Sequence, residues 1–200
     1  MLKIIGGILV VLFLSACGSE AETPSTPVAV RVELLGDSVT RQSGDTLVRH
    51  LPTGSSVVNH GLDGARASDF LTGRYGNLPL PWRKDTVYVV SFGANECLGG
   101  QDVADLVDAT RGIIEHGRAA GLANNFVIEA PWRVLHGINR CDLRIHDFRA
   151  AMVKLGVDMG VPTAIEDDTE SIGDAVHITQ RHNEIRAAVL AASILKIQAR

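Results

Sequence analysis

Short apolar runs alternate along this chain with longer segments whose apolar residues recur at helical spacing. The clearest run is 86–92, and the clearest amphipathic segment is 102–120, which ends at Gly121. Runs rich in Val and Ile and bounded by Gly, Pro or Asn are typical of buried strands. The pattern predicts strands at 30–35, 57–59, 86–92, 125–130 and 162–165. It predicts helices at 41–51, 67–75, 102–120, 142–159 and 179–199.

Strands that alternate with helices indicate a parallel sheet covered by helices on both faces. We therefore expect an α/β fold, a three-layer α/β/α sandwich with a five-stranded parallel sheet. The expected strand order is 2-1-3-4-5, as in flavodoxin-like sheets. Residues 30–200 contain no internal repeat and no sign of a second domain, so they are predicted to form one domain.

Residues 1–16 have the composition of an export signal rather than of the folded domain. Lys3 is followed by an uncharged apolar stretch, 4–14, which is shorter than the roughly 20 residues that a membrane-spanning helix needs. The stretch ends in Leu14-Ser15-Ala16-Cys17, which resembles the lipobox of bacterial lipoproteins. That resemblance implies that Cys17 is acylated and anchors the chain to a membrane. An ordinary secretory signal with a cysteine near its cleavage site is the alternative.

The polar, Pro-containing segment 17–29 is then expected to be the acylated Cys17 and a flexible tether. Together these features predict a protein of the bacterial cell envelope, lipid-anchored on the periplasmic or extracellular side. With Cys17 used for lipid, Cys97 and Cys141 remain as a pair in an oxidising compartment. We expect a disulfide between them, because both follow strands that are neighbours in the predicted sheet. Two unpaired buried thiols are the alternative.

Composition limits the class of protein further. The chain is 46% hydrophobic but only 4% aromatic, so its core must be largely aliphatic. The net charge is −4, and removal of residues 1–16, which carry Lys3 and no acidic residue, makes it −5. Because nucleic-acid binding needs a basic face, this balance argues against a nucleic-acid partner.

Polar clusters follow the first three predicted strands and precede the last helix. Val30–Leu35 runs into Gly36-Asp37-Ser38, where a helix is expected to begin. A serine at that position lies beside free backbone N–H groups, which suits a nucleophile of acyl transfer, although serine is also a common helix N-cap. The other clusters are Asn59–Arg66, Gly93–Glu96 and Asp174–His177. In a parallel sheet, function collects at the carboxyl edge, where these clusters are predicted to meet.

These clusters resemble, in order, the four sequence blocks of the SGNH hydrolases, also called GDSL-type esterases and lipases. The matching residues are Gly36-Asp37-Ser38, Asn59 with Gly64, Gly93-Ala94-Asn95-Glu96, and Asp174 with His177. The blocks span almost the whole predicted domain. One departure is Glu96, where the family usually has Asp. The resemblance implies a serine hydrolase acting on carboxylic esters, without metal or cofactor.

The resemblance also implies a role for each residue. Ser38 is the nucleophile, His177 the general base, and Asp174 the group that orients His177. The backbone N–H groups of Ser38 and Gly64 and the side-chain amide of Asn95 form the oxyanion hole. Gly61 lies in the same loop as Gly64 and is an alternative backbone donor. Asp37 is expected to brace the turn.

The remaining chemistry-bearing residues have weaker interpretations. Trp132 follows the fourth strand and is expected either to line an acyl or sugar pocket or simply to pack. The other histidines show no metal-ligand spacing, and the chain has no Gly-x-Ser-x-Gly, P-loop, His-Glu-x-x-His or Cys-x-x-Cys motif. The leading function is therefore hydrolysis of small-molecule, glycan or lipid esters, with a preference for short acyl groups. Acyl transfer by the same triad and a non-catalytic envelope lipoprotein are the alternatives.

Overall fold

The computed structural model describes residues 28–74, 81–131, 141, 144–165 and 179–199. Its strands are β1 (Arg31–Gly36), β2 (Ser56–Asn59), β3 (Thr86–Ser91), β4 (Phe126–Glu129) and β5 (Thr163–Ala164). Its helices are α1 (Ser38–Arg41), α2 (Gly44–Arg49), α3 (Ala67–Leu71), α4 (Ala94–Leu98), α5 (Val103–Ala119), α6 (Ile145–Met159) and α7 (Gln180–Gln198).

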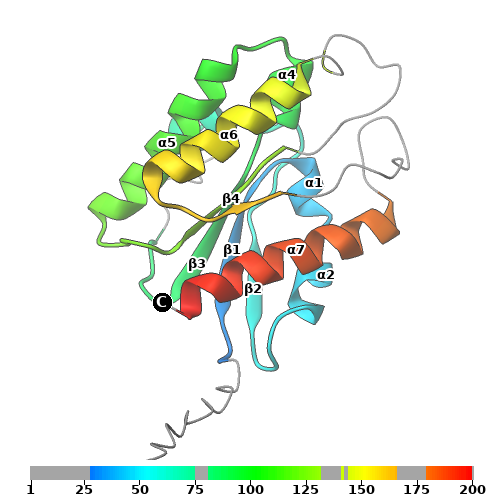
Figure 1. The fold of residues 1–200 in the computed structure, drawn as a ribbon, viewed down its shortest axis with the longest axis vertical. Coiled ribbons are helices and arrows are strands. Elements are labelled where there is room, and N and C mark those ends of the chain that lie inside the picture. The colour runs from blue at the N-terminus through cyan, green and yellow to red at the C-terminus, as the bar shows by residue number, and fades with distance from the viewer. Residues whose placement is uncertain (1–27, 75–80, 132–140, 142–143, 166–178, 200) are drawn as a thin grey trace, which may run out of the picture.

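The described strands form one parallel sheet in the order β2-β1-β3-β4-β5, which confirms the predicted topology. Helices α5 and α6 cover one face of the sheet, while α2 and α7 cover the other (Figure 1). The strands end in register, because Gly36 pairs with Ser91, Ser91 with Glu129, and Glu129 with Ala164. The loops that carry the candidate site therefore leave the sheet along one edge.

Two hydrophobic cores form because successive side chains of a buried strand point to opposite faces. The core beneath α2 and α7 is aliphatic, whereas the core beneath α5 and α6 also contains aromatic side chains, so the expectation of a largely aliphatic core holds for one face only. In β3, Tyr88 and Val90 pack with α3, α5 and α6, whereas Val87 and Val89 pack with α2 and α7. Strand β3 is buried along its whole length, as its position in the middle of the sheet requires. None of the described helices is long and apolar enough to cross a lipid bilayer.

Two predictions of helices need correction. The predicted helix 41–51 is two helices, and the first of them already begins at Ser38. The helical conformation is interrupted at Gln42 and Ser43. There the Ser43 hydroxyl donates to the Val39 carbonyl and competes with regular helical hydrogen bonding. The predicted helix 67–75 ends earlier, at Leu71, where the chain turns through Gly73 in a left-handed conformation. Helix α4 was not predicted.

Candidate active site

Ser38 is placed by a sharp turn between β1 and α1. Gly36 ends the strand, and a Cβ there would collide with the side chain of Thr40 and the carbonyl of Ser91. Asp37 is the N-cap of α1, and its side chain accepts a 2.9 Å hydrogen bond from the Val39 N–H. The predicted bracing role of Asp37 is therefore confirmed. Because Asp37 caps the helix, N-capping does not account for Ser38, which is the first helical residue and is 9% exposed.

Asp37 is also an unusual titrating group. Burial raises its pKa from 3.8 to about 6, against the opposing effects of the Val39 N–H and the charge of Arg186. The nearby carboxylates of Glu96 and Glu129 raise it further. Asp37 thus changes charge next to Ser38 in a pH range where a normal aspartate is fully ionised.

We expect Asp37→Asn to stabilise the protein above pH 6. Because its pKa is higher in the folded state, Asp37 binds its proton more tightly there than in the unfolded chain. The resulting contribution to stability is complete below pH 3.8 and is lost as pH rises through about 6. The shift of about two pKa units corresponds to about 3 kcal/mol. An asparagine still accepts the Val39 N–H but carries no charge, so the stability difference between variant and wild type should grow between pH 4 and pH 7.

Urea unfolding at pH 4, 5.5 and 7.5 measures this difference. Asp108→Asn, which changes an exposed carboxylate on α5, is the matched control and should show no such trend. A gap between Asp37→Asn and wild type that is constant over this pH range would contradict the prediction.

The loop after β2 packs directly against the nucleophile turn. The Asn59 side-chain amide donates to the carbonyls of Thr40 (2.8 Å) and Arg41 (3.1 Å) at the end of α1, and the Thr40 carbonyl also accepts from the Ser43 N–H. The Leu62 N–H donates to the Gly36 carbonyl at 3.1 Å. A Cβ at Gly61 would collide with the backbone of Asp37 and Arg41. The close approach of the two loops thus depends on a glycine at that position.

The two candidate backbone donors of this loop have different environments. The Gly61 N–H donates to the Asn59 side-chain oxygen at 2.9 Å, so that hydrogen is already used within the loop. Gly64 is exposed, has a φ of +72°, and faces open space where a Cβ would be. These environments favour Gly64 over Gly61 as a donor to a bound group.

Asn95 lies in α4, which is separated from the end of β3 only by Phe92 and Gly93. Its side-chain amide donates to the Ala65 carbonyl at 3.0 Å, which places it on the loop that carries Gly64. Gly93 has a φ of +131°, and a Cβ there would press on the Pro131 ring. The structure therefore brings the second and third sequence blocks together, and the second block is bonded to the first through Leu62 and Gly36.

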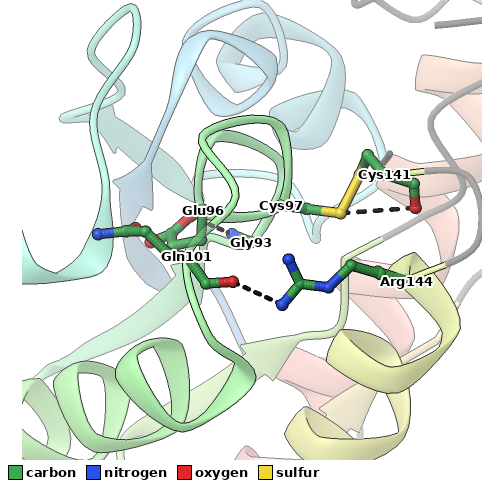
Figure 2. Close-up of a disulfide and its surroundings, with 6 residues drawn as sticks. All are labelled: Gly93, Glu96, Cys97, Gln101, Cys141 and Arg144. Carbon is green, nitrogen blue, oxygen red and sulfur yellow. Dashed lines mark hydrogen bonds between the residues drawn. A yellow bond between two sulfur atoms is a disulfide. The ribbon is translucent and has the colours of Figure 1, made fainter. Parts of the chain in front are cut away.

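The predicted disulfide joins helix α4, through Cys97, to Cys141. Cys97 and Cys141 are bonded, with their Cα atoms 5.3 Å apart, and the Gln101 carbonyl accepts a hydrogen bond from Arg144 at 2.8 Å (Figure 2). The disulfide prediction is confirmed, although Cys97 lies in a helix and not in a loop. Closing a loop of this length, with a sequence separation of 44, stabilises by about 4 kcal/mol on the chain-entropy model.

A buried ion pair lies beneath the same edge of the sheet. Arg186 of α7 is fully buried and forms a two-pronged ion pair with Glu129 at the end of β4. It also donates to the hydroxyls of Ser43, which follows α1, and Ser91, which ends β3. The guanidinium group thus links the C-terminal helix to three segments of the site edge.

The sequence predictions missed three residues that shape this site: Asn59 as a tie to α1, Glu96 as a link between loops, and Arg186. A signal for Arg186 was present, because it occupies the same helical stripe as the apolar Leu190 and Ile194. A charged residue on an apolar stripe indicates a buried and therefore paired charge.

Several predicted residues lie outside the described part of the chain. These are the triad residues Asp174 and His177, the pocket candidate Trp132, and the lipidation candidate Cys17. The described part of the chain contains no cluster of three or more His, Cys, Asp or Glu side chains that is arranged to hold a metal ion.

Solved structures with the same fold are numerous. A lipolytic protein of the G-D-S-L family from Veillonella parvula superposes with a TM-score of 0.66 at 15% identity, over 86% of this chain and 100% of the other. A lipase/acylhydrolase from Enterococcus faecalis gives 0.68 at 19% identity, over 84% and 96%. A carbohydrate acetylesterase from Sinorhizobium meliloti gives 0.64 at 15% identity, over 85% and 99%.

The sequence matches none of the protein-family models and none of the curated proteins compared with it. At these identities the structural likeness establishes the fold. The fold of this chain is that of the G-D-S-L or SGNH hydrolases, as the four sequence blocks implied.

Proposed function

We propose that this chain, which has the fold of the G-D-S-L hydrolases, cleaves carboxylic esters with Ser38 as its nucleophile. The observation that carries the proposal is the assembly of three sequence blocks at one edge of the sheet. The Gly36 carbonyl accepts from Leu62, and the Ala65 carbonyl accepts from Asn95, so the three loops bond to one another in sequence. The neighbours with this fold include a lipase/acylhydrolase, an aryl esterase and an acetyl xylan esterase.

In the proposed reaction, the Ser38 hydroxyl attacks the ester carbonyl carbon while His177 accepts the hydroxyl proton. Asp174 holds the imidazole in the required tautomer. Collapse of the tetrahedral intermediate breaks the bond to the alcohol, which leaves with the proton from His177. Water then attacks the acyl-enzyme with His177 again as base, and the acid leaves as Ser38 regains its proton.

The negative charge on the tetrahedral oxygen is stabilised by the N–H groups of Ser38 and Gly64 and by the Asn95 amide. Each such donor contributes about 3–4 kcal/mol to the transition state of a hydrolase. One hydrogen of the Asn95 amide is bonded to Ala65, which fixes the direction of the second hydrogen. This chemistry requires no metal and no cofactor.

The preferred substrate is proposed to be an ester of a short acyl group. Two neighbours of the same fold are described as an acetyl xylan esterase and a carbohydrate acetylesterase, which makes an acetylated glycan the first substrate to test. Hydrolysis of nitrophenyl esters from acetate to palmitate tests the function. We expect turnover that falls as the acyl chain lengthens, and acyl transfer would appear as a second product when an acceptor alcohol is added. Absence of turnover on every ester would contradict the proposal.

The proposed location is the bacterial cell envelope, with a lipid on Cys17 and the domain on an oxidising side of the membrane. The Cys97–Cys141 disulfide supports an oxidising compartment. Wild-type protein should partition into a detergent phase, and Cys17→Ser should remain in the aqueous phase. A wild-type protein found only in the aqueous phase would argue against the anchor.

A further inference from the structure

Glu96 is a buried carboxylate that joins the two loops of the proposed oxyanion hole. It is 2% exposed, although it follows Asn95 directly. One oxygen accepts a 2.7 Å hydrogen bond from the Ala67 N–H, and the other accepts a 3.0 Å hydrogen bond from the Gly93 N–H (Figure 2 shows the second). Ala67 begins α3, three residues after Gly64, and Gly93 is the N-cap of the helix that carries Asn95.

We propose that Glu96 is a positioning residue that sets the separation between the Gly64 N–H and the Asn95 amide. This inference rests on the proposed function of the site. The hydrogen bond from the Asn95 amide to the Ala65 carbonyl joins the same two segments. Together with the Glu96–Ala67 hydrogen bond, it holds α4 in one orientation against the Gly64 loop. A tetrahedral oxygen needs its donors within a narrow range of positions, and a shift of one of them weakens the transition state more than the substrate complex.

Helix capping alone does not explain Glu96. Helices α3 and α5 also have an acidic residue at the third position, and Asp69 and Asp105 accept from their own N-cap N–H at 3.1 and 3.3 Å. Those aspartates show that the shorter side chain is long enough to cap a helix in this protein. Glu96 makes the same capping bond and places its second oxygen on a different element, α3. The additional methylene of glutamate provides the reach for that second bond.

Glu96→Asp is therefore the informative substitution, because it keeps the charge and the cap but withdraws the second oxygen from Ala67. We expect kcat to fall between about 10- and 100-fold with KM changed less than about threefold, as for a small displacement of a transition-state donor. The melting temperature of the variant identifies any loss of folding. Glu96→Gln, which retains the length but replaces one acceptor with a donor, should lower kcat similarly.

A double-mutant cycle with Asn95→Ala separates positioning from general destabilisation. If Glu96 acts by placing Asn95, Glu96→Asp should have less than about a threefold further effect on kcat once the Asn95 amide is absent. Asp105→Asn, which alters a carboxylate that only caps, should leave kcat unchanged. Rates are to be normalised to the fraction of enzyme that reacts with a fluorophosphonate, so that unfolded protein is not counted.

Three outcomes would overturn the inference: an unchanged kcat in Glu96→Asp, a loss carried by KM alone, or the same fold-loss with and without Asn95. Each of these leaves the proposed function intact, provided that the wild type hydrolyses esters. If the wild type neither hydrolyses esters nor reacts with a fluorophosphonate, the proposed function itself is wrong and the inference fails with it.

Discussion

Replacing Ser38 with alanine is expected to lower kcat for ester hydrolysis by about 10⁴- to 10⁶-fold, the usual loss when a serine hydrolase is deprived of its nucleophile. The expectation follows from the position of Ser38 at the start of α1, with its helix capped by Asp37 rather than by its own hydroxyl. Without the hydroxyl no acyl-enzyme forms, and only direct attack by water remains. Folding should be unaffected, because removal of one oxygen leaves the Asp37–Val39 cap in place.

The measurement is turnover of nitrophenyl acetate together with labelling by a fluorophosphonate. Wild-type protein should be labelled on Ser38, and Ser38→Ala should not be labelled. Ser68→Ala, a partly exposed serine near the start of α3, is the matched control and should be both labelled and active. If Ser38→Ala retains more than about a hundredth of the wild-type kcat, the nucleophile has been assigned to the wrong residue.

The strands and their order could be predicted because the signal for a buried parallel strand is local. Each of the runs 86–92 and 125–130 is almost continuously apolar, and each is followed by a turn residue. The alternation of strands with helices then limits the topology to a few possibilities. The observed order β2-β1-β3-β4-β5 is one of these, and it was expected from the likeness to flavodoxin-like sheets rather than from the alternation alone.

Helix α4 could not be predicted from the same pattern, because a helix from Ala94 to Leu98 is too short to show periodicity. The one local signal is an acidic residue, Glu96, three positions after Gly93, which is the spacing of a helix cap. That signal does not reveal the second role of the carboxylate. Its contact with Ala67 joins positions 29 residues apart, and only the folded chain brings them together.

The raised pKa of Asp37 also could not be predicted from the sequence. Its motif indicated a turn, and the turn is present, but its raised pKa results from burial among segments that are distant in sequence. Arg186, Glu96 and Glu129, which all influence Asp37, come from three different elements. Local patterns predict which residues lie at the edge of the sheet, whereas the charge state at that edge depends on packing.

The second large effect is expected at the buried ion pair of Arg186 and Glu129. Arg186→Met should destabilise the fold by about 3–5 kcal/mol, because it leaves the Glu129 carboxylate buried without its partner. The double variant Arg186→Met/Glu129→Leu removes both charges and should recover most of the loss, since apolar side chains of similar volume replace a buried ion pair at little net cost. Recovery should be incomplete, because the Ser91 hydroxyl loses a donor.

Urea unfolding at pH 7 tests both expectations. The free energies of unfolding are compared from the midpoint urea concentrations, provided that the denaturant dependence (m value) is the same for each variant. The matched control is Arg49→Met, which breaks the exposed ion pair between Arg49 and Glu184 of the same helix α7 and should cost far less than Arg186→Met. If the double variant is as unstable as the single one, the loss comes from the other contacts of Arg186, those with Ser43 and Ser91 among them, and not from an uncompensated charge on Glu129. The ion pair would then be a secondary feature of a hydrogen-bond network that holds α7 against the edge of the sheet.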